Sequence, residues 1–144
     1  MMSQQERAEI IALIKREVIP AIGCTEPIAV ALCTARAAEA LGCRPERLEV
    51  LLSANILKNA MGVGIPGTGM IGLPIAVALG ALIGRSEYQL EVLRDVTPEA
   101  VAEGRRFIDE KRISIALKEG IEEKLYIEVH ALGGGHAATA VIAG

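Results

Sequence analysis

Hydrophobic and polar positions divide the chain into a helical first part and a strand-rich last third. Near the start, apolar residues recur every three or four positions, which predicts an amphipathic helix over 6–18 with one apolar face: Ile10, Leu13, Ile14 and Val18. A second helix is expected over 26–41, since Thr25 suits its N-cap and Gly42 suits its end.

The middle of the chain predicts three further elements around a glycine-rich loop. Residues 48–53 (LEVLLS) have the composition of a strand, and residues 54–61 that of a short helix. Residues 73–83 are almost wholly apolar, which predicts a buried helix. A helical turn is expected over 88–93.

The last part of the chain begins with a helix and continues with alternating segments. Thr97 and Pro98 suit the N-cap and the first turn of a helix that extends to about Lys111. Alternation then predicts three strands of an antiparallel meander, which the strand at 48–52 joins: 113–117, 125–130 and 137–142. The expected fold class is α+β, with N-terminal helices and a buried apolar helix packed on a small, mainly antiparallel sheet.

Composition and charge narrow the classes of function. Half of the 144 residues are hydrophobic, but only three are aromatic, and the net charge is −3 with both signs interspersed. Without a basic patch or stacking aromatics, we expect no nucleic-acid partner. The apolar run 70–83 is shorter than the ~20 residues of a membrane span. Three cysteines, an odd number, argue against a disulfide framework and favour the reducing cytoplasm.

The glycine-rich block over 62–84 is the first candidate binding site. Its G-x-G-x-x-G starts at Gly62, but a dinucleotide fingerprint needs a strand directly before it, and a helix is expected there. A better interpretation is that the backbone N–H groups of Gly67, Thr68 and Gly69 bind a carboxylate, aided by the following helix N-terminus. The alternative is that the glycines only allow close helix packing.

Cys24 is the main candidate for catalysis. A thiol directly before a helix lies in the positive potential of its N-terminus, which favours thiolate, so Cys24 could be a nucleophile, base or metal ligand. The alternative is a small buried residue in a tight turn. Cys33 is expected in the core and Cys43 in a turn without a role.

Other polar residues give weaker signals. Asn55, Lys58 and Asn59 share one face of the short helix and could orient a substrate amine or carboxylate, or could simply be solvated. His130 and His136 are the only histidines, and exposed positions on a strand and a turn are expected for them rather than a metal site.

Three segments resemble the L-cysteine desulfidase / L-serine deaminase-like family, long filed as an uncharacterised protein family. They are IGCTEPIAVAL (22–32), SANILKNAMGVGIPGTGMIGLPIAVALGALIG (53–84) and EVLRDVTPEAV (91–101). The resemblance implies that the single domain 1–144 is the N-terminal third of a protein of about 430 residues. It implies an iron–sulfur lyase that releases sulfide or water, with ammonia and pyruvate, from L-cysteine or L-serine.

The resemblance also implies a division of roles. Cys24, in the family's GCTEP motif, would act in catalysis as base or as a contact to a [4Fe-4S] cluster. The cysteines that hold the cluster lie outside this part of the family, so we expect no bound cluster and no activity from this chain alone. The substrate-binding residues would be Thr25, Glu26, Asn55, Lys58, Asn59, Gly67, Thr68 and Gly69.

Two further hypotheses remain open from the sequence. The chain could be a non-catalytic domain that binds a small molecule or assembles with a partner, or, less favoured, a dinucleotide-binding module. The expected partners are a small amino acid, the C-terminal cluster-bearing portion of the same protein, and a second copy of the chain. We expect the second copy because truncation would leave apolar surface of 73–83 uncovered.

Overall fold

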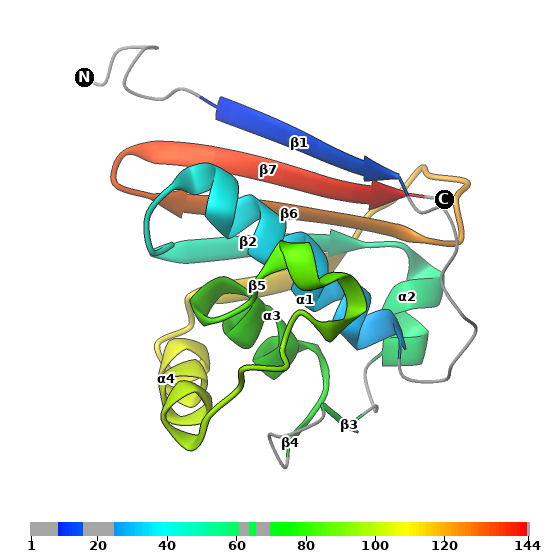
Figure 1. Cartoon of the computed structure of the whole chain (residues 1–144). Helices are drawn as coiled ribbons and strands as arrows, with labels where there is room; N and C mark the ends of the chain where they lie inside the picture. Colours follow the sequence, from blue (N-terminus) through cyan, green and yellow to red (C-terminus); the bar gives the residue numbers. More distant parts are fainter. Residues whose placement is uncertain (1–8, 16–24, 61–63, 66–69, 144) are drawn as a thin grey trace.

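The computed structural model describes residues 9–15, 25–60, 64–65 and 70–143. Five strands form one sheet in the order β1-β7-β6-β2-β5, and a separate two-stranded hairpin pairs β3 with β4. Helices α1, α3 and α4 lie together on one side of the five-stranded sheet (Figure 1). In chain order the elements are β1 Glu9–Lys15, α1 Thr25–Leu41, β2 Arg47–Leu52, α2 Ala54–Ala60, β3 Gly64–Ile65, β4 Met70–Ile71, α3 Leu73–Leu82, the 3-10 helix η1 Ser86–Glu91, α4 Pro98–Asp109, β5 Ile113–Leu117, β6 Tyr126–Gly133 and β7 His136–Ala143.

The sheet is mixed, and this corrects part of the prediction. Strand β6 runs antiparallel to both of its neighbours, β2 and β7, as expected. Strand β5 pairs in parallel with β2, and β1 in parallel with β7. The α+β class is confirmed, but the meander is wrong because β2 separates β5 from β6. Alternation identifies a strand without identifying its neighbours.

The predicted helix over 6–18 is wrong, since residues 9–15 form strand β1. Residues 10–14 (IIALI) are apolar without interruption and rich in isoleucine, a composition that suits a strand as well as a helix. All seven residues of β1 pair with β7, which gives this segment backbone hydrogen-bond partners on one side. Tertiary pairing therefore overrides the helical spacing.

The other predicted elements are confirmed to within three residues at their ends. Gly42 follows α1 with φ of 80°, the left-handed conformation in which glycine often ends a helix. Thr97 caps α4, because its Oγ1 accepts a hydrogen bond from the Ala100 N–H at 3.1 Å. The predicted turn of helix over 88–93 is present as η1, slightly earlier in the chain.

The core lies between the sheet and the helices. It is built from aliphatic side chains of β2, β6 and β7 on one side and of α1 and α3 on the other. Leu73 and residues 75–80 of α3 are buried, so the buried apolar helix is confirmed. This burial removes the reason for expecting uncovered apolar surface there, and self-association stays an untested prediction.

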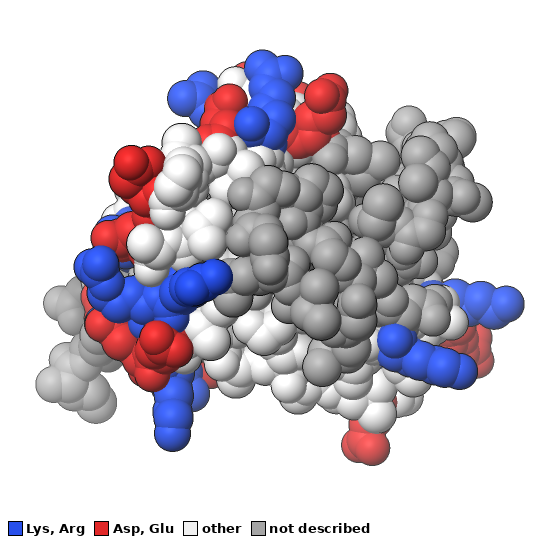
Figure 2. All heavy atoms as spheres, turned by 90° about the horizontal axis from the view of Figure 1, so that it is seen from below, with Lys and Arg blue, Asp and Glu red and all other residues white. Residues whose placement is uncertain are grey.

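The surface on the helical side carries mixed charges. Lys and Arg residues alternate with Asp and Glu residues around its rim (Figure 2). No helix in the described ranges is long and apolar enough to cross a membrane.

Candidate functional site

The predicted site residues are only partly described by the structure. Cys24 and the loop residues Gly67, Thr68 and Gly69 lie outside the described ranges. Thr25 and Glu26 form the first turn of α1, and Asn59 lies in α2; for these three only the backbone is described. Asn55 and Lys58 are exposed on α2, as a substrate-facing or a solvated pair would be.

Helices α1 and α3 run in the same direction. Gly80 of α3 lies so close to α1 that a Cβ there would be 2.5 Å from the Ala31 carbonyl oxygen. Four residues further on, a Cβ at Gly84 would lie 3.0 Å from the Cβ of Ala35, which is four residues after Ala31. The helices are therefore parallel, and their N-termini lie at the same end of the layer. At Gly80, the expectation that glycine permits close helix packing is confirmed.

The N-terminus of α3 has positive potential that no described side chain compensates. Its N-cap is Gly72, with φ of 93°, and no side chain in the described ranges caps the helix with a hydrogen bond. The first turn also contains no acidic residue. Free backbone N–H groups at such an end attract anions such as a carboxylate. The hairpin of β3 and β4, which the sequence did not predict, leads directly into this helix.

Helix α2 contacts α1 and lies beside its start (Figure 1). The Ser53 hydroxyl anchors α2, because it donates to the Lys124 carbonyl at 2.8 Å and accepts from the Ile56 N–H at 3.4 Å. Lys58 therefore adds a positive charge on a helix that is fixed to the end of β2. The sequence correctly predicted the helices α1, α2 and α3, but the relation between α1 and α3 comes from the structure alone.

A second polar cluster, which the sequence did not predict, lies on the opposite face of the sheet. On β6, Tyr126 donates a hydrogen bond of 2.7 Å to Glu128, and His130 Nε2 lies 2.5 Å from the other oxygen of that carboxylate. The Thr139 hydroxyl lies 2.8 Å from His130 Nδ1, and Lys118 Nζ lies 3.5 Å from Glu128. We call these five residues the Glu128 cluster.

The Glu128 cluster corrects the prediction that His130 is exposed. The side chains of His130 and Glu128 are 30% and 12% exposed, whereas His136 at the β6–β7 turn is exposed as expected. Because a carboxylate only accepts hydrogen bonds, Nε2 of His130 carries a proton and donates a hydrogen bond to Glu128. The signal in the sequence was the i, i+2, i+4 spacing of Tyr126, Glu128 and His130, which places all three on one face.

The environment shifts the pKa of two groups in the cluster. Burial raises the pKa of Glu128, but hydrogen bonds from Tyr126 and His130 and the charge of Lys118 outweigh it, so the net pKa lies below the ordinary 4.5. Burial, followed by the hydrogen bond to Glu128, raises the pKa of Tyr126 to about 12. Glu128 is thus held as the anion and Tyr126 as the neutral donor.

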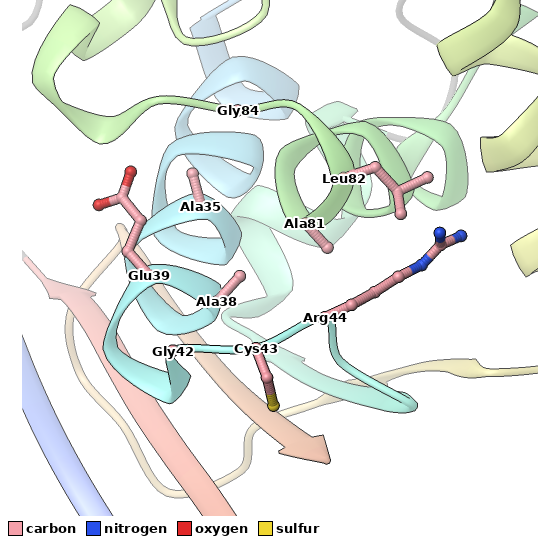
Figure 3. A pocket seen from close by; sticks show the side chains of 9 residues that line it. All are labelled: Ala35, Ala38, Glu39, Gly42, Cys43, Arg44, Ala81, Leu82 and Gly84. Atoms are coloured by element: carbon pink, nitrogen blue, oxygen red, sulfur yellow. The ribbon is translucent and has the colours of Figure 1, made fainter. Parts of the chain in front are cut away.

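A shallow pocket of about 400 Å³ lies at the other end of α1 and α3, where both helices finish. Figure 3 shows its alanine floor, formed by Ala35, Ala38 and Ala81, with Glu39 at one rim and Arg44 directed away from the hollow. Glu39 accepts hydrogen bonds from Ser86, and Arg44 pairs with Glu103 on α4. Both charged groups are thus engaged with the protein, and the pocket offers no converging polar groups.

The two described cysteines behave as predicted. Cys33 is fully buried, and its thiol donates to backbone carbonyls of β6 and β7, at 3.3 Å for the nearer. Burial raises the pKa of this thiol far above its usual range. Cys43 is exposed beyond Gly42. Within the described ranges, no group of three or more His, Cys, Asp or Glu side chains could hold a metal ion.

Comparison with known proteins shows what the sequence is similar to. A UPF0597 protein of Bacteroides thetaiotaomicron is 77% identical over 143 residues, and one of Bacteroides fragilis is 76% identical; in both cases 99% of this chain and 33% of the relative are covered. A UPF0597 protein of Photobacterium profundum is 46% identical over 133 residues, covering 92% of this chain and 31% of the relative. No family model and no solved structure matches the chain.

Nearly the whole chain is therefore similar to one segment of UPF0597 proteins. The chain spans about a third of the length of the curated relatives it matches. The assignment to the L-cysteine desulfidase / L-serine deaminase-like family is therefore wrong: the relatives carry the name UPF0597, and none of the names describes a lyase. The expected resemblance to an uncharacterised protein family agrees with the name UPF0597 that these relatives carry.

Proposed function

We propose that this chain is the substrate-binding part of a longer cytoplasmic enzyme that catalyses β-elimination on L-cysteine or L-serine. The observation that supports it is the parallel packing of α1 and α3. This packing brings the start of α1, directly after Cys24, to the same end as the uncapped N-terminus of α3. A thiolate base and a carboxylate site are two of the groups that β-elimination from an amino acid requires.

In this proposal the chain binds and orients the substrate. Backbone N–H groups at the start of α3, with the loop of Gly67, Thr68 and Gly69, bind the substrate carboxylate. Lys58 adds positive charge at this end and orients the substrate carboxylate. The thiolate of Cys24 takes the proton from Cα, its ordinary pKa of about 8.5 being lowered by the N-terminus of α1.

The elimination involves no net oxidation or reduction, so it needs no oxidant. As the Cα–H bond breaks, its electron pair forms the Cα=Cβ bond, and the Cβ–S or Cβ–O bond breaks to release sulfide or water once the leaving group is protonated. The aminoacrylate that remains tautomerises and is hydrolysed to pyruvate and ammonia. The described residues do not fit a [4Fe-4S] cluster, since Cys33 is buried in the core and Cys43 lies at an exposed turn. We place a cluster only in the longer protein, and no step here uses it.

The activity is tested in a longer protein. The Bacteroides fragilis relative, and a hybrid in which this chain replaces the third that it matches, are assayed anaerobically after iron reconstitution for sulfide and pyruvate from L-cysteine and L-serine. We expect turnover in both, and in the hybrid a loss of orders of magnitude on Cys24→Ser. Cys43→Ser is the matched control and should keep the activity. An inactive relative, or equal effects of the two variants, contradicts the proposal.

Binding is tested in this chain by NMR titration with L-serine. The carboxylate site predicts amide shifts at the starts of α1 and α3 that are absent with serinamide, which lacks the carboxylate. Lys58→Gln should weaken binding several-fold, whereas Lys111→Gln at the end of α4 should not. Specific binding to the chain combined with no turnover in the longer proteins would favour the alternative of a non-catalytic binding domain. Shifts of equal size with serinamide would exclude the carboxylate site itself.

A further inference from the structure

The five-stranded sheet has one face that no helix or strand of the described chain covers (Figure 1). Side chains alternate along β2, β6 and β7, so that residues between the core positions point to this side. We call it the outer face. Its central residues are half-buried side chains of neighbouring strands: Leu51, Tyr126, Glu128, His130, Leu132 and Val141.

The outer face has an apolar frame around the Glu128 cluster. Cross-strand pairing places Leu51 on β2 and Val141 on β7 on either side of Glu128. Val141 and Leu51 are half-buried, and Tyr126 adds an aromatic ring beside them. Aliphatic and aromatic side chains around a few satisfied polar groups are typical of the centre of a protein interface.

The charges on this face compensate one another. Glu128 is neutralised by Lys118 and bonded to His130, and Glu49 pairs with Arg47 at 3.6 Å. No buried side-chain nitrogen or oxygen in the described ranges lacks a hydrogen-bond partner. A covering layer would therefore not leave these carboxylates buried without a partner, which is the main electrostatic penalty of burying such a face.

We propose that the outer face is the surface on which this segment docks against the rest of the longer UPF0597 protein. The relatives are about three times as long as the chain, because it covers 33% of them, so the larger part of such a protein lies outside the segment described here. A sheet buries its apolar face by packing against another layer of secondary structure, and the longer protein can supply a second layer for the outer face. The proposal does not depend on the proposed lyase activity, because it concerns the opposite face of the sheet.

Two tyrosines, the only ones in the chain, give a matched test. Tyr126 lies on the outer face and Tyr88 on η1, and both are half-buried. Hydroxyl-radical oxidation followed by mass spectrometry would compare this chain with the same sequence placed in the Bacteroides fragilis relative. We expect oxidation of Tyr126 to fall about fivefold or more in the longer protein, as for a residue at the centre of an interface, while Tyr88 changes little. Unchanged oxidation of Tyr126, or equal protection of both tyrosines, would overturn the proposal.

A charge placed on the outer face tests the same surface by disruption. In the longer protein, Val141→Lys should restore oxidation of Tyr126, whereas Val101→Lys, at a half-buried valine of α4, should leave it protected. Ser114→Lys on β5 is exposed and serves if Val141→Lys fails to fold, which circular dichroism of the chain alone would show. If Tyr126 is already protected in the chain alone and light scattering shows a dimer, the occupant is a second copy and the proposal fails.

Discussion

The contact between Gly80 and helix α1 permits a sharp test of the fold. A Cβ at Gly80 would lie 2.5 Å from the Ala31 carbonyl oxygen and 3.1 Å from the Cβ of Thr34. Ordinary contact begins at 3.4 Å, so Gly80→Ala must move α3 away from the α1 backbone by about 0.9 Å. Gly104 on α4 is the matched control, because its added Cβ would meet the tip of the Ile75 side chain at 2.9 Å, and this tip can rotate away.

The two substitutions share one favourable contribution and differ in strain. Replacing a helical glycine by alanine stabilises a helix by up to about 1 kcal/mol, and both variants gain it. Overpacking of a tight core typically costs about 1–3 kcal/mol, with the upper end expected where backbone must move. Gly80→Ala should therefore be destabilised by a net ~1–2 kcal/mol, whereas Gly104→Ala should stay within ~1 kcal/mol of the parent.

Urea denaturation followed by circular dichroism measures both free energies of unfolding. The slopes of the transitions should be equal, so that the midpoints compare stability directly. A Gly80→Ala variant that is as stable as Gly104→Ala would refute the close parallel packing of α1 and α3. The same result would remove the observation that supports the proposed function.

Four other outcomes follow from local contacts. Thr97→Ala should cost about 1 kcal/mol in urea denaturation by removing the cap of α4, and Thr97→Ser should restore most of it. Because the pKa of Glu128 is lowered in the folded state, its stabilising contribution is present above pH 4.5 and is lost as pH falls through the folded value; Glu128→Gln should flatten this part of the stability–pH curve. Because the pKa of Tyr126 is raised, its contribution is lost between pH 10 and about 12, and Tyr126→Phe should abolish that loss. A maleimide should modify Cys43 in the native protein and Cys33 only after unfolding, as peptide mass mapping would show; rapid native labelling of Cys33 would contradict its burial.

Local signals in the sequence were sufficient for most elements between Thr25 and β7. Caps, glycines and periodicity identified α1, α4 and the strands because those signals act within a few residues. They failed for β1, whose isoleucine-rich segment satisfies two periodicities and is decided by a partner at the far end of the chain. They also failed for strand order, since the insertion of β2 between β5 and β6 depends on contacts between distant segments.

The candidate site also combines features that local sequence predicts with features that depend on contacts between distant segments. The positions of Asn55 and Lys58 on an exposed helix follow from local sequence, and so does the start of α1 directly after Cys24. The finding that α1 and α3 start at the same end of the layer depends on the contact between Gly80 and Ala31. No local pattern in the sequence predicts this contact. The Glu128 cluster was missed because its five members come from two strands, β6 and β7, and from the residue after β5.

The parallel pairing of β1 with β7 has a consequence for how the chain acquires its sheet. β1 is the earliest strand in the sequence, and its neighbour is the latest, while β2 must also wait for both β5 and β6. On the ribosome, α1 and α3 can meet through their small residues long before any part of the five-stranded sheet can close. Because such non-local pairings slow folding, β1 remains an exposed, isoleucine-rich segment until β7 has been synthesised. Its protection from aggregation in that interval must come from outside the sheet.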